Sequence, residues 1–152
     1  MLRRGSRRGS SDSGDRDSTT RLSPSLSTLN ISRSDWWIVT TARSNVLIEG
    51  SDATIDAVIV ALRAQLRAPV RDWRLGVAAL PGGTLVVRGV DLLDAETQRA
   101  LLDHLSSAAS SGTQQVVSTS GQALFALVDR GLFLEELYYR LNTVLLQPDR
   151  KS

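Results

Sequence analysis

Short apolar runs alternate with longer segments of helical periodicity along most of this chain. Short runs centred on β-branched or other apolar residues, bounded by Gly, Pro or polar residues, predict buried strands. They occupy residues 45–49, 84–87, 114–118 and 143–146, and the more polar segment 70–73 is a further candidate for a short strand. Between them, apolar residues recur every three or four positions, as in a helix with one face against a core. These segments are 55–66, 94–105, 122–130 and 133–141.

Strands that alternate with helices predict a parallel sheet, because each crossover must return the chain to the same end of the sheet. We therefore expect a single α/β domain with about five strands and helices on both faces. Turn residues support this division. Pro69 ends the first helix, and the Pro81-Gly82-Gly83 turn introduces a strand. Asp94 caps the next helix, and Gly131 suits the left-handed position after another.

The first 34 residues differ in composition from the rest. They hold seven arginines against three aspartates and very few large apolar side chains. Such a segment buries too little apolar surface to offset the entropy lost on ordering. We expect a disordered basic tail at 1–34 and a folded domain at 35–152. The domain carries eleven basic and thirteen acidic groups, so the basic pI comes from the tail.

The sequence offers few groups for metal or thiol chemistry. It has no cysteine and one histidine, His104. This excludes disulfides and thiolate metal sites, and it leaves no histidine cluster for a metal ion. The apolar runs are too short to span a bilayer, and the arginine-rich start lacks the apolar segment of a secretory signal. We expect a cytoplasmic protein with no metal site and no membrane contact.

The segment 133–142 reads Phe-Leu-Glu-Glu-Leu-Tyr-Tyr-Arg-Leu-Asn. Eight of these ten positions are identical to F-R-E-D-L-Y-Y-R-L-N, and the segment closely resembles that signature of the AAA+ ATPase domain in sigma-54-dependent transcriptional activators. The resemblance extends over roughly residues 42–148. It implies a P-loop, AAA+-like core, which in the family binds and hydrolyses ATP and contacts sigma-54.

The phosphate-binding loop of that family, G-E-S-G-T-G-K-E, aligns with the eight residues that begin at Gly50. Glycines in such a loop let backbone N–H groups surround phosphates, and the lysine neutralises their charge. Gly50 and Thr54 are retained and are the candidate nucleotide-binding residues. Ala53 and Ile55 replace glycines, and Asp56 replaces the lysine. We expect a helix N-terminus with acidic residues in place of a phosphate cradle, and no ATP as cofactor.

The family's magnesium-binding acidic pair lies in G-G-T-L-F-L-D-E-I. Arg88 and Gly89 stand at those two positions, so the resemblance implies no magnesium site here. The asparagine that senses the γ-phosphate corresponds to Gly121. We therefore expect no catalytic residue and no ATPase activity.

Two arginines of the family signature reach the nucleotide of a neighbouring subunit. The first corresponds to Leu134, and the second is retained as Arg140. Arg140 is therefore a candidate subunit contact, and the alternative is an ion pair with Glu136, four residues earlier on the helix. Four residues of the signature are expected in the core: Phe133, Leu137, Tyr138 and Tyr139.

Two segments of the family are missing. The interval before the Pro81-Gly82-Gly83 turn is too short for the sigma-54-contacting G-A-F-T-G-A loop, and the chain stops before the helical lid and any helix-turn-helix domain. We expect no sequence-specific DNA binding. The sequence favours a non-catalytic pseudo-AAA+ module that acts by protein–protein contact in transcriptional regulation. Its expected partner is an AAA+ activator subunit or a sigma-54 RNA polymerase component. Two alternatives stay open: an ATP-binding domain with residual nucleotide binding, and a partial gene product without activity.

Overall fold

Residues 28–76, 80–109 and 114–150 are described by the computed structural model. Their five strands form one sheet in the order β2-β3-β4-β1-β5, and every neighbouring pair is parallel. The strands are β1 (Val46–Glu49), β2 (Val70–Asp72), β3 (Thr84–Val87), β4 (Gln115–Ser120) and β5 (Val144–Leu146). The predicted α/β fold is confirmed, and each strand lies within about two residues of its predicted position.

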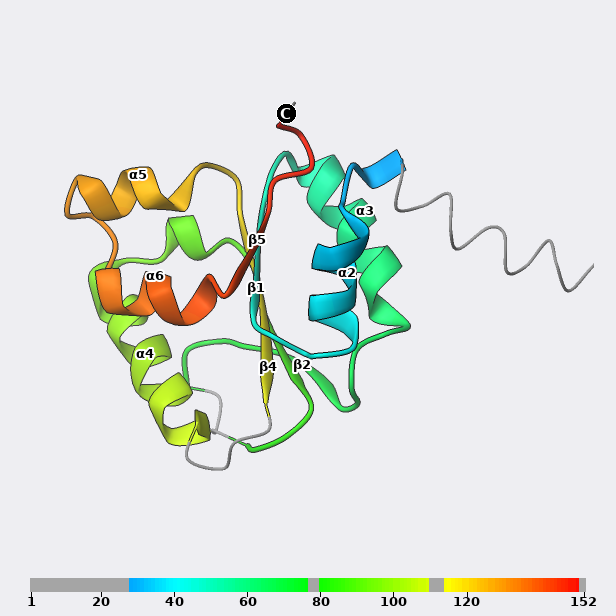
Figure 1. Cartoon of the computed structure of the whole chain (residues 1–152). Helices are drawn as coiled ribbons and strands as arrows, with labels where there is room; N and C mark the ends of the chain where they lie inside the picture. The colour runs from blue at the N-terminus through cyan, green and yellow to red at the C-terminus, as the bar shows by residue number, and fades with distance from the viewer. Residues whose placement is uncertain (1–27, 77–79, 110–113, 151–152) are drawn as a thin grey trace, which may run out of the picture.

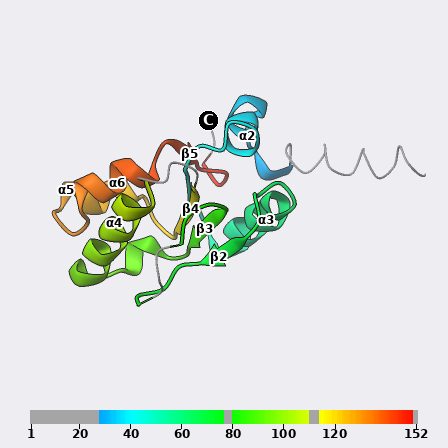
Figure 2. The ribbon, with the colours of Figure 1, turned by 90° about the horizontal axis from the view of Figure 1, so that it is seen from below.

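Helices cover both faces of the sheet (Figure 1). One face carries α2 (Arg33–Thr40) and α3 (Asp52–Arg63). The other carries α4 (Ala95–Ala109), α5 (Leu124–Asp129) and α6 (Glu135–Leu141). Figure 2 shows the same two groups from below. A short 3-10 helix, η1 (Val90–Leu92), leads from β3 towards α4.

The strands contribute side chains to two apolar cores, because successive residues of a strand point to opposite faces. Leu47 in β1 packs in the cluster with α4, α5 and α6, whereas its neighbours Val46 and Ile48 pack in the cluster with α2 and α3. All three side chains are fully buried. Burial on both faces explains why β1 and β3 read as apolar runs instead of alternating with polar residues. The edge strand β2 is only partly buried and reads Val-Arg-Asp.

Asp94 and two of the predicted turn glycines lie where they were expected, but Pro69 does not end the first helix, because α3 begins at Asp52 and ends at Arg63 with Ala64 as its C-cap. Asp94 accepts a hydrogen bond from the backbone N–H of Thr97 at 2.8 Å. The side chain and backbone of Thr97 hold the pKa of Asp94 below the ordinary value of an aspartate. Gly131, after α5, has a φ of 74°. Gly83 has a φ of 68°, and a Cβ there would lie 2.2 Å from the carbonyl oxygen of Pro69.

The folded domain begins before residue 35, the start predicted from composition. Ile31 is only 8% exposed. Ser32 caps α2 by accepting a hydrogen bond from the backbone N–H of Asp35 at 3.1 Å. The side-chain amide of Asn30 donates to the carbonyl oxygen of Pro148 at 3.2 Å. The boundary moves because this burial and capping anchor residues 28–34 on the domain. The rest of the predicted tail, residues 1–27, lies outside the described residues.

The signature segment needs two corrections. The predicted helix at 133–141 begins at Glu135, with Leu134 as its N-cap. Phe133, Leu137 and Tyr138 are buried as expected, but Tyr139 is 60% exposed. A helix that packs on one side leaves the positions between its apolar residues in solvent, and Tyr139 occupies such a position. Among the described residues, no helix is long and apolar enough to cross a membrane.

Candidate functional site

The carboxyl ends of β1 and β4 form the edge of the sheet at which ligands bind in open parallel folds. β1 is followed by α3 on one face and β4 by α5 on the other, so the chain leaves these adjacent strands in opposite directions. Such a switch point opens a crevice beyond the strand ends. We call this region the carboxyl edge. Gly50 and Thr54 follow β1 at this edge, and Arg88 follows β3.

The connection between β1 and α3 is very short. β1 ends at Glu49 and α3 begins at Asp52, so only Gly50 and Ser51 lie between them. Ser51 caps the helix by accepting a hydrogen bond from the backbone N–H of Thr54 at 3.3 Å. Ile55 is 6% exposed and packs in the core with α2. The stretch aligned with the phosphate-binding loop thus forms the first turns of a helix, as predicted.

A carboxylate from the far end of the chain lies against this helix start. The backbone N–H of Ser51 donates to Oδ2 of Asp149 at 2.7 Å, and the hydroxyl of Thr54 donates to Oδ1. The hydrogen bonds from Thr54, and next from Ser51, hold the pKa of Asp149 below the ordinary value of an aspartate. A Cβ at position 50 would lie 2.9 Å from Oδ2 of Asp149, so glycine leaves room for the carboxylate. The structure therefore brings Gly50 and Thr54 together around Asp149.

The sequence analysis missed Asp149. It follows the last strand, 98 residues after Ser51 in the chain. The contact exists because β5 pairs with β1 and delivers the following residues to the same edge. No local pattern around Asp149 signals this.

An ion pair joins the two positions where charge differs most from the family. Nη1 of Arg88 lies 3.4 Å from Oδ1 of Asp56. In the residues that the structure describes, this is the one ion pair recorded. Asp56 aligns with the family's lysine and Arg88 with an acidic residue, so the signs of both charges are reversed. The side chains are 69% and 47% exposed, so the pair lies at the surface.

Other polar groups of the carboxyl edge have partners within the protein. Glu49 is 7% exposed; it accepts hydrogen bonds from the backbone N–H of Leu124 and the side chain of Gln147, both at 2.8 Å. The backbone N–H of Gly89 donates to the hydroxyl of Thr119 at 2.9 Å. Within residues 28–76, 80–109 and 114–150, no three acidic or histidine side chains converge as a metal site requires.

Comparison with known protein families identifies the family to which the chain belongs. A family model described as the sigma-54 interaction domain matches residues 53–148, more than half of the chain. The chain belongs to the sigma-54 interaction domain family. The resemblance drawn from the signature segment is thereby confirmed.

Solved structures of NtrX from Brucella abortus are similar in fold. The structure in complex with ATP matches with a TM-score of 0.60 and 22% identity, over 81% of this chain and 35% of that chain. The structure in complex with ADP matches with a TM-score of 0.54 and 19% identity, over the same shares. The chain thus spans about a third of NtrX, and at these identities the similarity shows the fold alone. No curated protein shows significant sequence similarity to the chain.

Arg140, the retained arginine of the sigma-54 interaction domain signature, lies away from Gly50 and Thr54. It belongs to α6, on the opposite face of the sheet from α3 (Figure 1). Its Nη1 donates to the carbonyl oxygen of Leu105 in α4 at 3.5 Å. The alternative ion pair with Glu136 is absent from this part of the chain, because the guanidinium turns to α4. A role in subunit contact stays a prediction.

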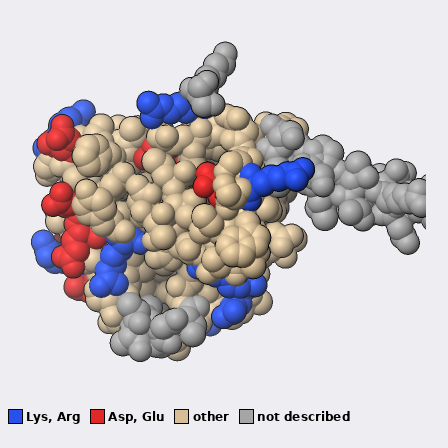
Figure 3. Space-filling view, viewed as in Figure 1, with Lys and Arg blue, Asp and Glu red and all other residues tan. Residues whose placement is uncertain are grey.

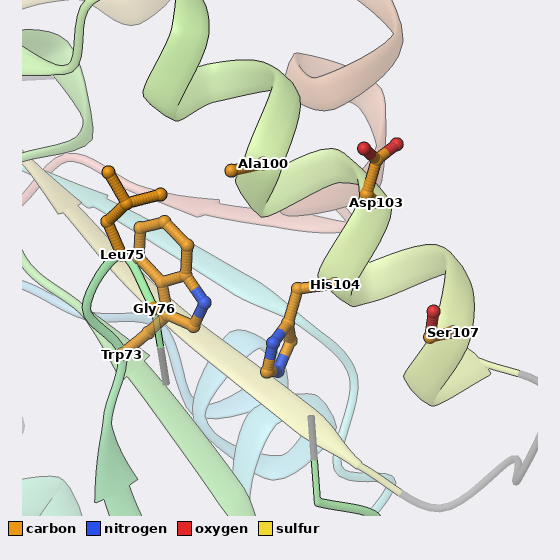
Figure 4. Close-up of a pocket in the computed structure, with 7 residues that line it drawn as sticks. All are labelled: Trp73, Leu75, Gly76, Ala100, Asp103, His104 and Ser107. Atoms are coloured by element: carbon orange, nitrogen blue, oxygen red, sulfur yellow. The ribbon is translucent and has the colours of Figure 1, made fainter. Parts of the chain in front are cut away.

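A hollow of this sigma-54 interaction domain lies between α4 and the segment after β2, away from the carboxyl edge. It has a volume of about 330 Å³. The ring of Trp73 meets that of His104 edge to face, with centroids 6.2 Å apart. Figure 4 shows both side chains at this hollow, with Asp103 and Ser107 on α4 beside them. Burial lowers the pKa of His104, the only histidine of the chain, and so favours its uncharged form.

The face of the domain shown in Figure 3 carries acidic and basic side chains interspersed along its margin, with uncharged residues between them. Nucleic-acid-binding domains typically gather Lys and Arg in a stripe or patch. No such stripe crosses the described residues on this face.

Proposed function

We propose that this chain is a non-catalytic sigma-54 interaction domain, a pseudo-AAA+ module that acts in the cytoplasm by protein–protein contact in transcriptional regulation. The observation that carries this proposal is the two-residue connection between β1 and α3. A phosphate-binding loop needs several residues whose N–H groups converge on the phosphates before the helix begins. Here the helix begins too early to supply them.

The charges at the carboxyl edge support the same proposal. Asp52 and Asp56 lie in the first turns of α3, and Asp149 contacts its start. A carboxylate at about 4 Å from a phosphate charge opposes binding by about 1 kcal/mol in water and about 4 kcal/mol at an effective dielectric of 20. The side chain of Arg88 would attract phosphate, but it is already paired with Asp56.

The proposed partner is an AAA+ activator subunit or a sigma-54 RNA polymerase component. Family membership supports this choice, and so does an aromatic cluster on α5 and α6. The rings of Phe125 and Tyr139 lie 5.7 and 5.3 Å from the ring of Tyr138, and they are 51% and 60% exposed. Exposed aromatic side chains are enriched in protein interfaces relative to the rest of a protein surface.

Catalysis is tested with the purified full chain beside an intact sigma-54-dependent activator as positive control. We expect no phosphate release above the buffer blank and no calorimetric signal from millimolar ATP. Micromolar ATP binding by this chain would favour the first alternative, a domain with residual nucleotide binding.

Partner binding is tested by sedimentation velocity with a fluorescently labelled chain. It is mixed with an activator AAA+ domain or with sigma-54 RNA polymerase. We expect a complex with one of them that Tyr139→Ser weakens. Val60→Ser is the matched control, because Val60 is 73% exposed on α3, at the opposite face of the sheet. No complex with either protein would favour the second alternative, a partial gene product without activity.

A further inference from the structure

The segment after β5 holds Asp149 in a fixed place. Pro148 is buried, and its carbonyl oxygen accepts a hydrogen bond from the side chain of Asn30. The same amide donates to the carbonyl oxygen of Arg150 at 3.3 Å, and Gln147 donates to the buried Glu49. Asp149 is thus flanked on both sides by tethered residues, and its carboxylate is positioned by the backbone.

The carboxylate takes the place that an anion would take at this helix. The first N–H groups of a helix have no partner within it, and the helix dipole favours negative charge at that end. Asp149 satisfies the N–H of Ser51 and the hydroxyl of Thr54 with one oxygen each. A phosphate at the start of α3 would compete with Asp149 for these two donors.

We propose that Asp149 is a ligand-excluding residue, an internal carboxylate that occupies the start of α3 and keeps phosphate groups from it. A phosphate must first break two hydrogen bonds to Asp149 and then approach the displaced carboxylate. The inference rests on the proposed function only in taking the start of α3 as the place where phosphate would approach.

A plain structural tether is the rival explanation. In that case Asp149 fastens the end of the chain to α3 and has no influence on anions. The two explanations differ in what happens when the carboxylate is removed. Exclusion predicts that phosphate reaches the start of α3, whereas a tether predicts a looser chain end and no phosphate response.

The test is an NMR titration of the ¹⁵N-labelled full chain with inorganic phosphate at neutral pH, with sodium chloride titrated in parallel as the ionic-strength control. The variants are Asp149→Ala and Asp149→Asn, and the second loses the charge while keeping the shape. Asp129→Ala is the matched control, because Asp129 is exposed at the end of α5. Thermal unfolding confirms that each variant is folded.

We expect the amide resonances of Ser51 and Thr54 to move saturably with phosphate in both Asp149 variants, with an apparent Kd at least about tenfold lower than in the wild type and in Asp129→Ala. The inference would be overturned if the Ser51 and Thr54 resonances of the Asp149 variants did not shift with phosphate, or shifted equally with chloride. An equal phosphate response in the wild type would overturn it as well. Micromolar ATP binding by the wild type is a different result, and it would count against the proposed function.

Discussion

Exchanging the charges of Asp56 and Arg88 tests how much their ion pair contributes and whether charge alone bars nucleotides. The variants are Asp56→Lys, Arg88→Asp and the double exchange. At 3.4 Å, two unit charges attract by about 1 kcal/mol in water and about 5 kcal/mol at an effective dielectric of 20. With side chains 47% and 69% exposed, screening and side-chain entropy reduce this to about 0.2–1 kcal/mol.

Each single variant replaces the attraction with a contact between like charges. We expect each to lower the free energy of unfolding by about 0.5–2 kcal/mol, because the attraction is lost and a repulsion of similar size is added. The double exchange restores opposite charges and should return to within about 0.5 kcal/mol of the wild type. Urea unfolding at low salt measures all four proteins, and about 1 M salt should shrink the differences.

A non-interacting combination provides the control. The variant that combines Arg88→Asp with Asp129→Lys makes the same two kinds of charge change as the double exchange. Its acidic residue, Asp129, lies at the end of α5 instead of beside Arg88. These two effects should add. If the Asp56 and Arg88 changes also add without recovery in the double exchange, the ion pair is refuted.

The double exchange also separates charge from loop length. It places a lysine and an aspartate where the family has its lysine and an acidic residue. We still expect no ATP binding, because the connection from β1 to α3 keeps its two residues. ATP binding by the double exchange in a calorimetric titration would show that charge, and not the early helix start, was the barrier.

Three further outcomes check the fold. Ser32→Ala should lower the free energy of unfolding by about 1 kcal/mol, because the N–H of Asp35 loses its acceptor; an unchanged urea curve would contradict the capping of α2 by Ser32. Gly83→Ala should lower the thermal midpoint more than Gly131→Ala. Both positions have a left-handed backbone, which strains alanine by about 1–2 kcal/mol. Only at position 83 would the added Cβ also meet a carbonyl oxygen, so an equal lowering of the thermal midpoint in the two variants would contradict this contact. Since the pKa of Asp94 is lowered by folding, its stabilisation is present above the ordinary aspartate pKa and is lost as pH falls through the lowered value. Asp94→Asn should therefore flatten the acid side of a plot of thermal midpoint against pH, and an unaltered slope would refute the role of the cap.

Strands β1 and β3 were predictable because each is buried along its whole length and reads as a mainly apolar run. The signature at 133–142 likewise predicted the family. No such signal marks α2. Of its two tryptophans, Trp37 is 58% exposed, and Val39 is its one fully buried residue, so the helix lacks a continuous apolar stripe.

Contacts at the carboxyl edge were less predictable than the elements that carry them. The sequence identified Asp56 and Arg88 as charges unlike those of the family, but not that they pair. It identified Gly50 and Thr54, but not their contact with Asp149. These contacts depend on which strands are neighbours, and strand order joins residues that are 32 and 95 positions apart. Local periodicity carries no such information.

A shared fold does not imply a shared ligand. The NtrX structure in complex with ATP has a similar fold, so the sheet and its switch point alone do not distinguish this chain from a nucleotide-binding protein. The difference that we propose lies in how the donors of the carboxyl edge are used. Ser51 and Thr54 donate to Asp149, and Arg88 pairs with Asp56. A nucleotide would have to displace the carboxylate of Asp149 and separate Asp56 from Arg88. The two-residue connection between β1 and α3 would then supply few N–H groups to bind its phosphates. Each of these three changes made alone leaves the other two barriers in place, so nucleotide binding should require removal of Asp149, exchange of the ion pair and a longer connection together.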